Sequence, residues 1–535
     1  MIYLTAPLFR AAAIFATLMA LVLSASMANA QSAAFRQAVA EGAARDDTLA
    51  EFYRTRDFQG LWTGNSDEEI RRRNALLAAF ANAGDHGLPA ATYDPDVLMI
   101  RLLAARTGAE MGAIEVDMSR MFLSYARSIQ TGILTPSDVV DEIKREVTRR
   151  APMDYLRGLE ASSPAGYLAS LSPSTPEYAR LMREKLRLER LVSGGGWGPT
   201  IQTDRIEPGA TGGNVIALRD RLVAMGFMDR SATQRYDAPL QSAIQGFQTA
   251  HGLTPDGVAG SDTINQINIP ATARLQQIIV AMERERWINV PRGVRHIWVN
   301  LTDFTAAVVD NDRVTFSTRS VIGALDGDRQ SPEFSDLMNH MVINPTWYIP
   351  RSIIVNEYLP ALQRNRNALG HLQITNRNGQ RISRGSVNFN RYTARTFPFA
   401  MRQPPSNTNA LGLVKFMFPN PYNIYLHDTP AKSLFGREVR AFSHGCIRLN
   451  DPFEFAYALL AAQEADPQGF FDSILGSGRE RRVNLDAPVP VHIVYRTAFT
   501  HTTGQLHFRR DVYGRDGLIW AALANEGVAV RAFGG

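Results

Sequence analysis

The sequence predicts a multidomain α+β protein, with helical domains in its N-terminal half and a mostly β domain in its C-terminal half. Two observations predict this order. Apolar residues recur at helical spacing in most of the chain before residue 287, whereas apolar and polar residues alternate, as in strands, from His296 onwards. A chain of 535 residues, 45% of them hydrophobic, is long enough for roughly three to four domains with cores of their own.

The first thirty residues have the pattern of a secretory signal peptide. Arg10 precedes an apolar run from Ala11 to Leu23, and Ala28-Asn29-Ala30 places small residues before Gln31. A retained membrane anchor is the alternative, but the apolar run is shorter than the ~20 residues that span a bilayer. We therefore expect a signal peptide over residues 1–30, export to the periplasm, and no transmembrane span in the mature chain.

The charge of the chain is compatible with an anionic partner. The formal net charge is +5, and the basic residues are spread along the sequence rather than gathered in blocks. A basic exported protein suits an anionic polymer such as the cell wall, although a solvated surface of mixed charge explains the same composition. The chain has no basic aromatic motif, so we expect no nucleic acid partner.

Residues 31–200 are predicted to form a helical domain. Runs such as IRRRNALLAAFANAG and MSRMFLSYARSIQTGIL carry the helical period, and Gly and Pro interrupt them at DHGLPAATYDPD and ILTPSD. The region contains no catalytic signature. The segment SGGGWGPTIQ, residues 193–202, is typical of a glycine-rich linker.

A small three-helix module is predicted over residues 206–270. Two of its helices show apolar faces at helical spacing. The residues of these faces are Val215, Leu218, Leu222 and Met225, and then Leu240, Ile244 and Phe247. The TPDG turn precedes a third short helix from Thr263, which Asp262 or Ser261 is placed to cap. The stretches GGNVIALRDRLVAMGF and FQTAHGLTPDGVAGSDT resemble the peptidoglycan-binding domain family, which implies association with the cell wall.

After one further helix, strand-like sequence patterns define the C-terminal half, residues 273–516. HIWVNLTDFTAAVV and RVTFSTRSVIG predict strands around a VDNDR turn, and MNHMVINPTWYIP predicts a strand that ends at Pro350. Residues 351–402 are mixed and polar, so we expect an insertion that leaves the sheet and returns. Strand character resumes at LGLVKFMFPN, the last hairpin turns at Gly504, and residues 517–535 are expected to be a tail.

The chain contains one cysteine, Cys446, in the stretch REVRAFSHGCIRLND. A single cysteine cannot form a disulfide within its own chain, and a free thiol outside the cytoplasm is open to oxidation. A buried, inert cysteine is one interpretation. A nucleophile is the other, and it requires a nearby base or positive charge that favours the thiolate.

Two histidines lie near this cysteine in the sequence. His444 is two residues before Cys446, and residues at i and i+2 of an extended segment do not easily reach each other's ends. His427 arrives from the end of another predicted strand and is the expected base. Asp428 and Thr429 follow it, so a backbone carbonyl or a side-chain oxygen there can accept from the second imidazole nitrogen, the third role of a triad.

The residues around the thiol suit acyl transfer. Gly445 allows a close backbone approach, and we expect the amides of Gly445 and Cys446 to point at a developing oxyanion. Arg448 offers a guanidinium fork to a carboxylate. Neither an HExxH motif nor paired cysteines occur in the sequence, so we expect no metal and no cofactor.

The stretch HDTPAKSLFGREVRAFSHGCIRLND resembles the signature of the L,D-transpeptidase catalytic family. The similarity extends through NPTWYIP, QPPSNTNALGLVKFMFPN and YNIYLHDTP, and covers about His296 to Asp516. With the helical region and the small module, nearly the whole mature chain is similar to the large periplasmic branch of this family. The resemblance implies a mostly β catalytic sandwich with an inserted capping subdomain, preceded by a helical scaffold domain and a peptidoglycan-binding domain.

The resemblance also implies a reaction. Cys446 attacks the bond between meso-diaminopimelate and D-alanine in a stem tetrapeptide, D-alanine leaves, and an amine of a second stem's diaminopimelate resolves the thioester into a 3–3 cross-link. His427 is implied as general base and acid, and Asp428 as its orienter, through its backbone carbonyl. Carbapenems are implied to acylate the same sulfur. The other implied site residues are His444 and Gly445 in the catalytic loop and, for substrate binding, Tyr425, Ser443, Arg448, Asn450, Trp347 and Tyr348.

Several alternatives stay open at this point. Water as acceptor makes the protein an L,D-carboxypeptidase, and an amine of an outer-membrane protein as acceptor makes it an enzyme that anchors that protein to the wall. An inert wall-binding scaffold needs no chemistry at all. For Trp347 and Tyr348, ordinary core packing is the alternative to a substrate groove. The sequence does not distinguish the acceptors or the oligomeric state.

Overall fold

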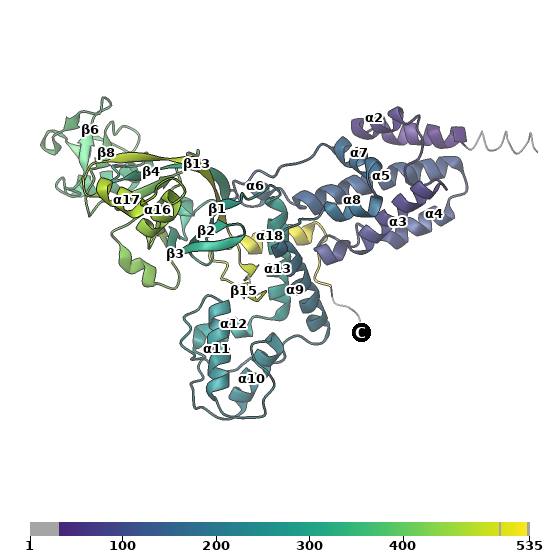
Figure 1. Cartoon of the computed structure of the whole chain (residues 1–535), viewed down its shortest axis with the longest axis horizontal. Helices are drawn as coiled ribbons and strands as arrows, with labels where there is room; N and C mark the ends of the chain where they lie inside the picture. Colours follow the sequence, from purple (N-terminus) through teal and green to yellow (C-terminus); the bar gives the residue numbers. More distant parts are fainter. Residues whose placement is uncertain (1–31, 502–503, 532–535) are drawn as a thin grey trace, which may run out of the picture.

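The computed structural model describes residues 32–501 and 504–531, and the expected signal peptide lies outside the described residues. Three parts surround a central group of helices (Figure 1). The N-terminal helices extend to one end, the sheet lies at the other, and a small helical module projects from the middle. The predicted fold class is confirmed. No helix within the described ranges has the length and apolar character required to cross a membrane.

The N-terminal helical domain packs around a single apolar core. Its two longest helices begin at capping motifs that can be recognised in the sequence. Ser66 and Glu69 form a capping box at the start of α3, and Thr107 with Glu110 does the same for α5. The helices of this domain are α2 (Asp47–Thr55), α3 (Asp67–Ala81), α4 (Pro95–Ala104), α5 (Gly108–Thr131), α7 (Pro152–Ala161) and α8 (Pro164–Ser170).

A second core, which we call the central hub, joins segments that are far apart in the sequence. Its helices are α6 (Pro136–Val139), α9 (Pro176–Ser193), α13 (Ala271–Trp287) and α18 (Arg515–Asn525), and the hairpin of β14 (Ala498–Thr500) and β15 (Leu506–Phe508) packs with them. The expectation of a tail from residue 517 is wrong. Ile519 and Leu523, four residues apart, bury one face of α18 in this hub. α9 likewise contributes Leu181 and Leu188 to the hub rather than to the N-terminal core.

The small module contains the three predicted helices, α10 (Gly213–Met225), α11 (Ala238–Ala250) and α12 (Ser261–Asn268). Leu218, Leu222, Ile244 and Phe247 lie in its core, as the helical spacing predicts. The third helix begins two residues earlier than expected, and neither Ser261 nor Asp262 is its N-cap. The helix begins at Ser261, with Gly260 as N-cap, so Asp262 lies in the first turn, where a negative charge favours the helix dipole.

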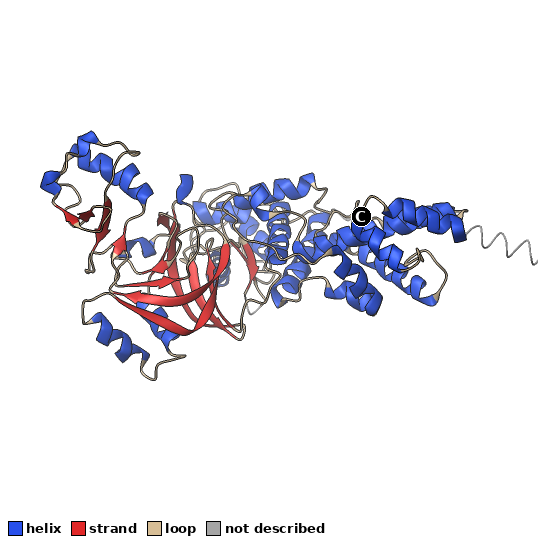
Figure 2. Cartoon of the chain, turned by 90° about the horizontal axis from the view of Figure 1, so that it is seen from above, coloured by secondary structure: helices blue, strands red, loops and turns tan. Residues whose placement is uncertain are grey.

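A nine-stranded mixed sheet forms the C-terminal half. The strand order is β11-β3-β12-β10-β9-β4-β13-β1-β2, and β2 also pairs with β3, so the sheet closes on itself. Figure 2 shows it as a curved layer of arrows. The strands are β1 (Arg295–Asn300), β2 (Thr305–Asp310), β3 (Arg313–Gly323), β4 (Phe334–Ile343), β9 (Val414–Met417), β10 (Leu426–His427), β11 (Ala441–Ser443), β12 (Ile447–Leu449) and β13 (Arg481–Val494), with helices α16 (Pro452–Leu460) and α17 (Pro467–Leu475) beside them.

The insertion forms a small unit of its own, set apart at the far end of the sheet (Figure 2). It has a separate apolar core, which includes Ile354, Leu362 and Met401. Its four-stranded sheet has the order β5-β8-β6-β7. The elements are β5 (Trp347–Tyr348), α14 (Arg351–Ile353), the π-helix η3 (Ile354–Tyr358), α15 (Leu359–Arg364), β6 (Gln373–Thr375), β7 (Arg381–Ile382) and β8 (Ala400–Gln403). We call this unit the cap.

Candidate active site

Two parallel strands bring the predicted nucleophile and base to one face of the sheet. β10 pairs with β12 so that Leu426 lies opposite Ile447 and His427 lies opposite Arg448. Leu426 and Ile447 point into the core. Because side chains alternate along a strand, Tyr425 and His427 share the other face with Cys446 and Arg448. Because Leu426 and Ile447 are buried in the core, the four side chains of Tyr425, His427, Cys446 and Arg448 must lie on the opposite face of the sheet.

Cys446 is partly buried, and its thiol is protonated at neutral pH. Burial raises the pKa of Cys446 to about 11, against the opposing effect of hydrogen bonds from the backbone and side chain of Tyr425 and of the positive charges of Arg448 and Lys415. The sulfur also lies 3.4 Å from the carbonyl oxygen of Asn423. The predicted nucleophile therefore rests as a thiol rather than a thiolate, and it would have to lose its proton during any attack.

His427 is buried and neutral, which makes it a proton acceptor. Burial, together with the smaller effect of the positive charge of Arg448, lowers the pKa of His427 to about 3. The Nδ1 atom of His427 contacts the backbone carbonyl oxygen of Asp428, and a carbonyl can accept only from a protonated Nδ1. This contact leaves Nε2 as the basic atom. No hydrogen bond joins His427 to Cys446 among the described residues, and such bonds often tighten only when substrate is bound.

The side chain of Asp428 is turned away from the imidazole. Its carboxylate accepts the N–H of Leu413 at 2.9 Å and pairs with the ammonium of Lys432 at 2.9 Å. Lys432 also donates to the carbonyl oxygen of Asn450 at 3.0 Å. Asp428 thus reaches His427 through its backbone, and its carboxylate fixes the loops on either side of β10.

The loop before Cys446 is held by Ser443 and Gly445. Gly445 has φ of +107°, a conformation that residues with a Cβ rarely adopt. The hydroxyl of Ser443 donates to the carbonyl oxygen of Cys446 and accepts the N–H of Gly445 at 3.1 Å. The expectation that both amides face an oxyanion is therefore wrong for Gly445, whose N–H is already bonded within the loop. The N–H of Cys446 remains for that role.

His444 faces the cap rather than the thiol. Its Nε2 lies 2.6 Å from the Oε1 of Glu357, which is on η3. Both side chains are partly exposed, at 37% and 45%. The contact links the loop that carries Cys446 to the cap, and sequence spacing gave no sign of it because the partners are 87 residues apart.

The remaining predicted residues divide into two groups. The indole of Trp347 is hydrogen-bonded to Tyr425 and lies edge-on to Tyr358 at 6.4 Å, so it adjoins the thiol. Tyr348 is 64% exposed and follows Trp347 in a strand, so it points to the opposite side.

Arg448 and Asn450 also differ in their surroundings. The buried Nε of Arg448 has no hydrogen-bond partner among the described residues, so this cation beside the thiol can meet an anion. The Asn450 side chain donates to Asp451 at 2.7 Å, and its N–H donates to the carbonyl oxygen of Arg319 at 3.0 Å. Asn450 therefore holds the loop after β12 in place.

Lys415 is a site residue that the sequence analysis missed. It lies on β9 directly opposite His427, and it shares the polar face with it. Its ammonium is 5.9 Å from the centre of the Tyr425 ring, and burial lowers the pKa of Lys415. Lys415 and Arg448 thus flank His427 on the two neighbouring strands. The alternation in LVKFMF puts Lys415 on a polar face, but only the strand register shows whose neighbour it is.

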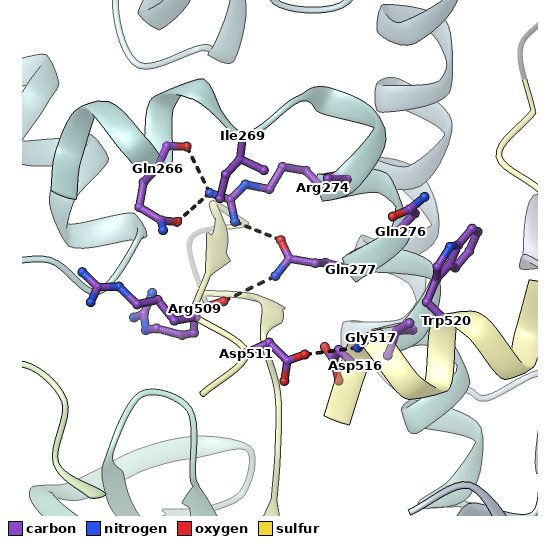
Figure 3. Close-up of a pocket in the computed structure, with 13 residues that line it drawn as sticks. Gln266, Ile269, Arg274, Gln276, Gln277, Arg509, Asp511, Asp516, Gly517 and Trp520 are labelled. Atoms are coloured by element: carbon purple, nitrogen blue, oxygen red, sulfur yellow. Dashed lines mark hydrogen bonds between the residues drawn. The ribbon is translucent and has the colours of Figure 1, made fainter. Parts of the chain in front are cut away.

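A cavity of about 380 Å³ lies elsewhere, between the small module and the central hub. Figure 3 shows that Arg274 donates hydrogen bonds to Gln266 and Gln277 there, and that Gln277 donates to the backbone carbonyl oxygen of Arg509. None of the predicted site residues lines this cavity. Among the described residues, no cluster of three or more His, Cys, Asp or Glu side chains is arranged to hold a metal ion.

Comparison with protein-family models gives three matches. Residues 294–481 match the L,D-transpeptidase catalytic domain, residues 47–184 match a scaffold domain, and residues 211–267 match the "Putative peptidoglycan binding domain". A curated protein of Haemophilus influenzae named "Putative L,D-transpeptidase" is 27% identical over 248 residues, which cover 46% of this chain and 50% of that protein. The chain thus aligns with about half the length of this relative.

Solved structures give weaker similarities. The L,D-transpeptidase of Xylanimonas cellulosilytica is 14% identical, with a TM-score of 0.16, over 56% of this chain and 98% of that one. The L,D-transpeptidase of Stackebrandtia nassauensis is 14% identical, with a TM-score of 0.22, over 56% of this chain and 97% of its own. The comparison therefore rests on the family-model matches and the curated relative: residues 294–481 match an L,D-transpeptidase catalytic domain, after segments that match a scaffold domain and a peptidoglycan-binding domain.

Proposed function

We propose that this protein is a peptidoglycan L,D-transpeptidase of the periplasm that forms 3–3 cross-links. The observation that carries the proposal is the placement of Cys446 and His427 on one face of adjacent parallel strands, within a domain that matches the L,D-transpeptidase catalytic family. The peptidoglycan-binding module supports the same substrate class. Cys446 would be the nucleophile and His427 the general base.

The acylation step follows from the protonation states of the two groups. Sulfur attacks the carbonyl carbon of meso-diaminopimelate in a stem tetrapeptide while its proton passes to Nε2 of His427. The carbon–nitrogen bond to D-alanine then breaks, and the imidazolium returns the proton to the departing amine. A thioester on Cys446 remains. A neutral thiol and a neutral imidazole carry out this step without forming a stable ion pair in the resting enzyme.

The charges around the thiol suit an anionic peptide. Arg448 and Lys415 flank His427, and stem peptides carry free carboxylates close to the bond that is cleaved. A guanidinium can bind a carboxylate through two parallel hydrogen bonds, so we assign donor binding to Arg448, with Lys415 contributing positive charge. The Trp347 indole, bonded to Tyr425, would wall the donor groove on the side of the cap.

Resolution of the thioester decides between cross-linking and hydrolysis. The amine of a second diaminopimelate attacks the thioester carbon, the carbon–sulfur bond breaks, and the thiol is regenerated. The cap is joined to the catalytic loop through Glu357 and His444. A lid that excludes water favours the amine over hydrolysis, and we therefore favour transfer over a carboxypeptidase function.

The test is intact-protein mass spectrometry of the mature chain with purified tetrapeptide muropeptides, and separately with a carbapenem. We expect an adduct on the native protein and none on Cys446→Ala. The muropeptide products distinguish the acceptors, since 3–3 dimers indicate transfer and tripeptides alone indicate hydrolysis. A folded protein with a reduced thiol that forms no adduct with either reagent would refute the proposal and leave the inert scaffold.

A further inference from the structure

Ser331 is a buried serine that touches the catalytic loop from behind. It lies in the segment between β3 and β4 and is 0% exposed. Its hydroxyl donates to the carbonyl oxygen of Gly445 at 2.6 Å and accepts the N–H of Gly323 at 2.9 Å. A hydroxyl has a single hydrogen to donate, so the proton of Ser331 is committed to Gly445.

This contact sets the orientation of the peptide that joins Gly445 to Cys446. The described peptide bonds are trans, and in a trans peptide the carbonyl oxygen and the N–H point in opposite directions. The Gly445 oxygen points inward, to Ser331. The Cys446 N–H therefore points outward, away from Ser331, and no described residue accepts a hydrogen bond from it.

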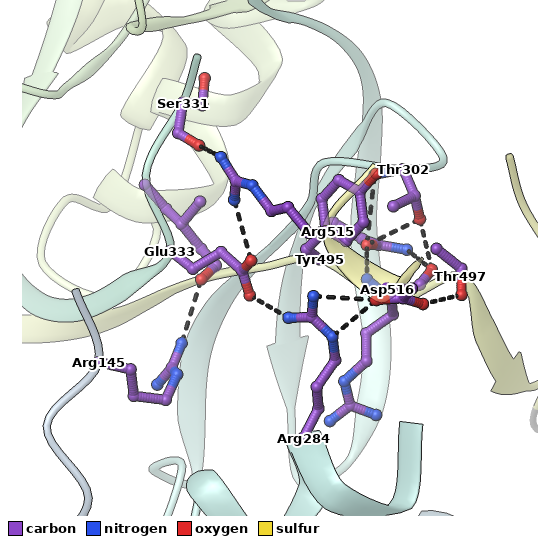
Figure 4. A network of polar contacts seen from close by, with 12 residues as sticks. Arg145, Arg284, Thr302, Ser331, Glu333, Tyr495, Thr497, Arg515 and Asp516 are labelled. Carbon is purple, nitrogen blue, oxygen red and sulfur yellow. Dashed lines mark hydrogen bonds and ion pairs between the residues drawn. The ribbon is translucent and has the colours of Figure 1, made fainter. Parts of the chain in front are cut away.

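Ser331 is itself fixed by the C-terminal segment. Its N–H donates to the hydroxyl of Tyr513 at 3.3 Å, and its carbonyl oxygen accepts from Arg515 at 2.8 Å. Arg515 lies over the Tyr513 ring at 4.6 Å and pairs with Glu333 at 2.9 Å. Figure 4 shows this buried network, in which Arg284 bridges Glu333 and Asp516. Both main-chain groups of Ser331 are held, so its hydroxyl has little freedom to move.

We infer that Ser331 is a positioning residue for the acylation step: its hydrogen bond to Gly445 keeps the Cys446 N–H directed at the oxyanion that forms when the sulfur adds to a carbonyl. The inference rests on the proposed role of Cys446 as an acylating nucleophile. Without the hydroxyl, the Gly445–Cys446 peptide can rotate, and glycine imposes little resistance because it adopts many backbone conformations. The donor would then be lost from the site while the thiol stayed in place.

Two small reagents separate this role from a general structural one. p-Nitrophenyl acetate acylates a thiol through a tetrahedral oxyanion, and it requires no recognition of a stem peptide. Iodoacetamide alkylates the same thiol by displacement of iodide, and no oxyanion forms. We expect Ser331→Ala to lower the acylation rate about hundredfold, the lower end of the effect of removing one oxyanion donor, and to change the alkylation rate less than about twofold.

Three further variants serve as controls, and each changes one hydroxyl-bearing side chain. Ser320→Ala removes a fully buried hydroxyl that has no hydrogen-bond partner, and it should leave both rates unchanged. Ser331→Thr restores a hydroxyl and should recover most of the acylation rate. Tyr513→Phe, which loosens Ser331 without changing its side chain, should slow acylation selectively and serves if Ser331→Ala does not fold.

The outcomes are distinct. Selective loss of acylation with recovery in Ser331→Thr supports the inference. An equal loss of both rates, or no loss of acylation, overturns it. Release of D-alanine from a tetrapeptide muropeptide by the wild-type protein is measured in parallel. If that release is absent while the ester still acylates Cys446, the proposed substrate is wrong and the role of Ser331 is still decided.

Discussion

His444 Nε2 lies 2.6 Å from Glu357 Oε1, and this pair joins the loop that carries Cys446 to the first helical turns of the cap. The cap has its own core and its own small sheet, so a few contacts of this kind determine how closely it sits over the thiol. The pair is partly exposed, and water weakens it accordingly.

Removing this contact should change the fate of the thioester rather than its formation. We expect Glu357→Ala to raise the share of tripeptide over 3–3 dimer in the products, because a looser cap admits water. The acylation rate with p-nitrophenyl acetate should stay within about twofold of the wild-type rate. Glu526→Ala, at an exposed glutamate after α18, is the control. An unchanged product ratio would contradict a role for this pair in closure.

The pH dependence of alkylation should report the raised pKa of Cys446. The thiol is protonated below a pKa of about 11, so the thiolate fraction falls tenfold for each pH unit below that value. The iodoacetamide rate should climb without levelling off through pH ~10, whereas an ordinary cysteine levels off above its pKa of about 8.5. A plateau near neutral pH would show instead a resting thiolate–imidazolium pair.

The pH dependence of acylation should differ from that of alkylation. The pKa of His427 is lowered to about 3, so the imidazole is the neutral base at every pH above that value and is lost only as the pH falls towards it. We expect the p-nitrophenyl acetate rate to stay level between pH ~5 and ~8, where an unperturbed histidine would lose its basic form below about 6.5. His427→Gln should abolish the level region together with most of the rate.

Lys415→Met should slow the thiol reaction at fixed pH. The positive charge of Lys415 lowers the pKa of Cys446, so its removal raises that pKa and reduces the thiolate fraction. We expect the iodoacetamide rate at pH 9 to fall about twofold to fivefold, as suits one charge in a partly solvated site. Lys144→Met removes a surface lysine that pairs with Asp141 and should have no effect. Equal iodoacetamide rates in both variants would contradict an effect of Lys415 on the pKa of Cys446.

Gly445→Ala should damage the loop through its backbone. The residue has φ of +107°, and an added Cβ would meet the side chain of Ile424 at 3.2 Å. A non-glycine residue in such a conformation costs about 1–3 kcal/mol, so we expect a lower melting temperature and loss of acylation. Gly436→Ala, where an added Cβ meets nothing within 4 Å, is the matched control. A fully active Gly445→Ala would contradict the strained loop.

The sequence predicted most elements because their periodicity is local. Val215, Leu218 and Leu222 recur at the helical period and form one face of α10, and the HIWVN stretch alternates as β1 does. The pairing of Cys446 with His427 was predicted because the family signature contains both the histidine and the later Ser-His-Gly-Cys motif. Composition alone does not indicate that these two residues lie close together. Ser331 and Glu357 escaped prediction, since both reach the loop from segments far along the chain.

The pairing register of the strands and the packing of distant helices could not be predicted from the sequence either. Lys415 is recognisable as the polar member of an alternating strand, but its place opposite His427 depends on the pairing register between β9 and β10. The sequence does not separate α18 from a solvated tail, because its two buried apolar residues, Ile519 and Leu523, form too short a stripe. Its partner α13 lies more than 200 residues earlier in the sequence, so nothing local indicated the packing.

The central hub has a consequence for the order in which the protein can assemble. α9 and α18 both pack on α13 in one core, so the hub around residue 188 stays incomplete until the segment around residue 519 is added. Contacts of such long sequence separation form late, after the costly closure of a long loop. The N-terminal helical domain can fold as soon as it emerges, but the hub cannot be completed until α18 has been synthesised. Loss of α18 would therefore expose apolar surface on helices made hundreds of residues earlier.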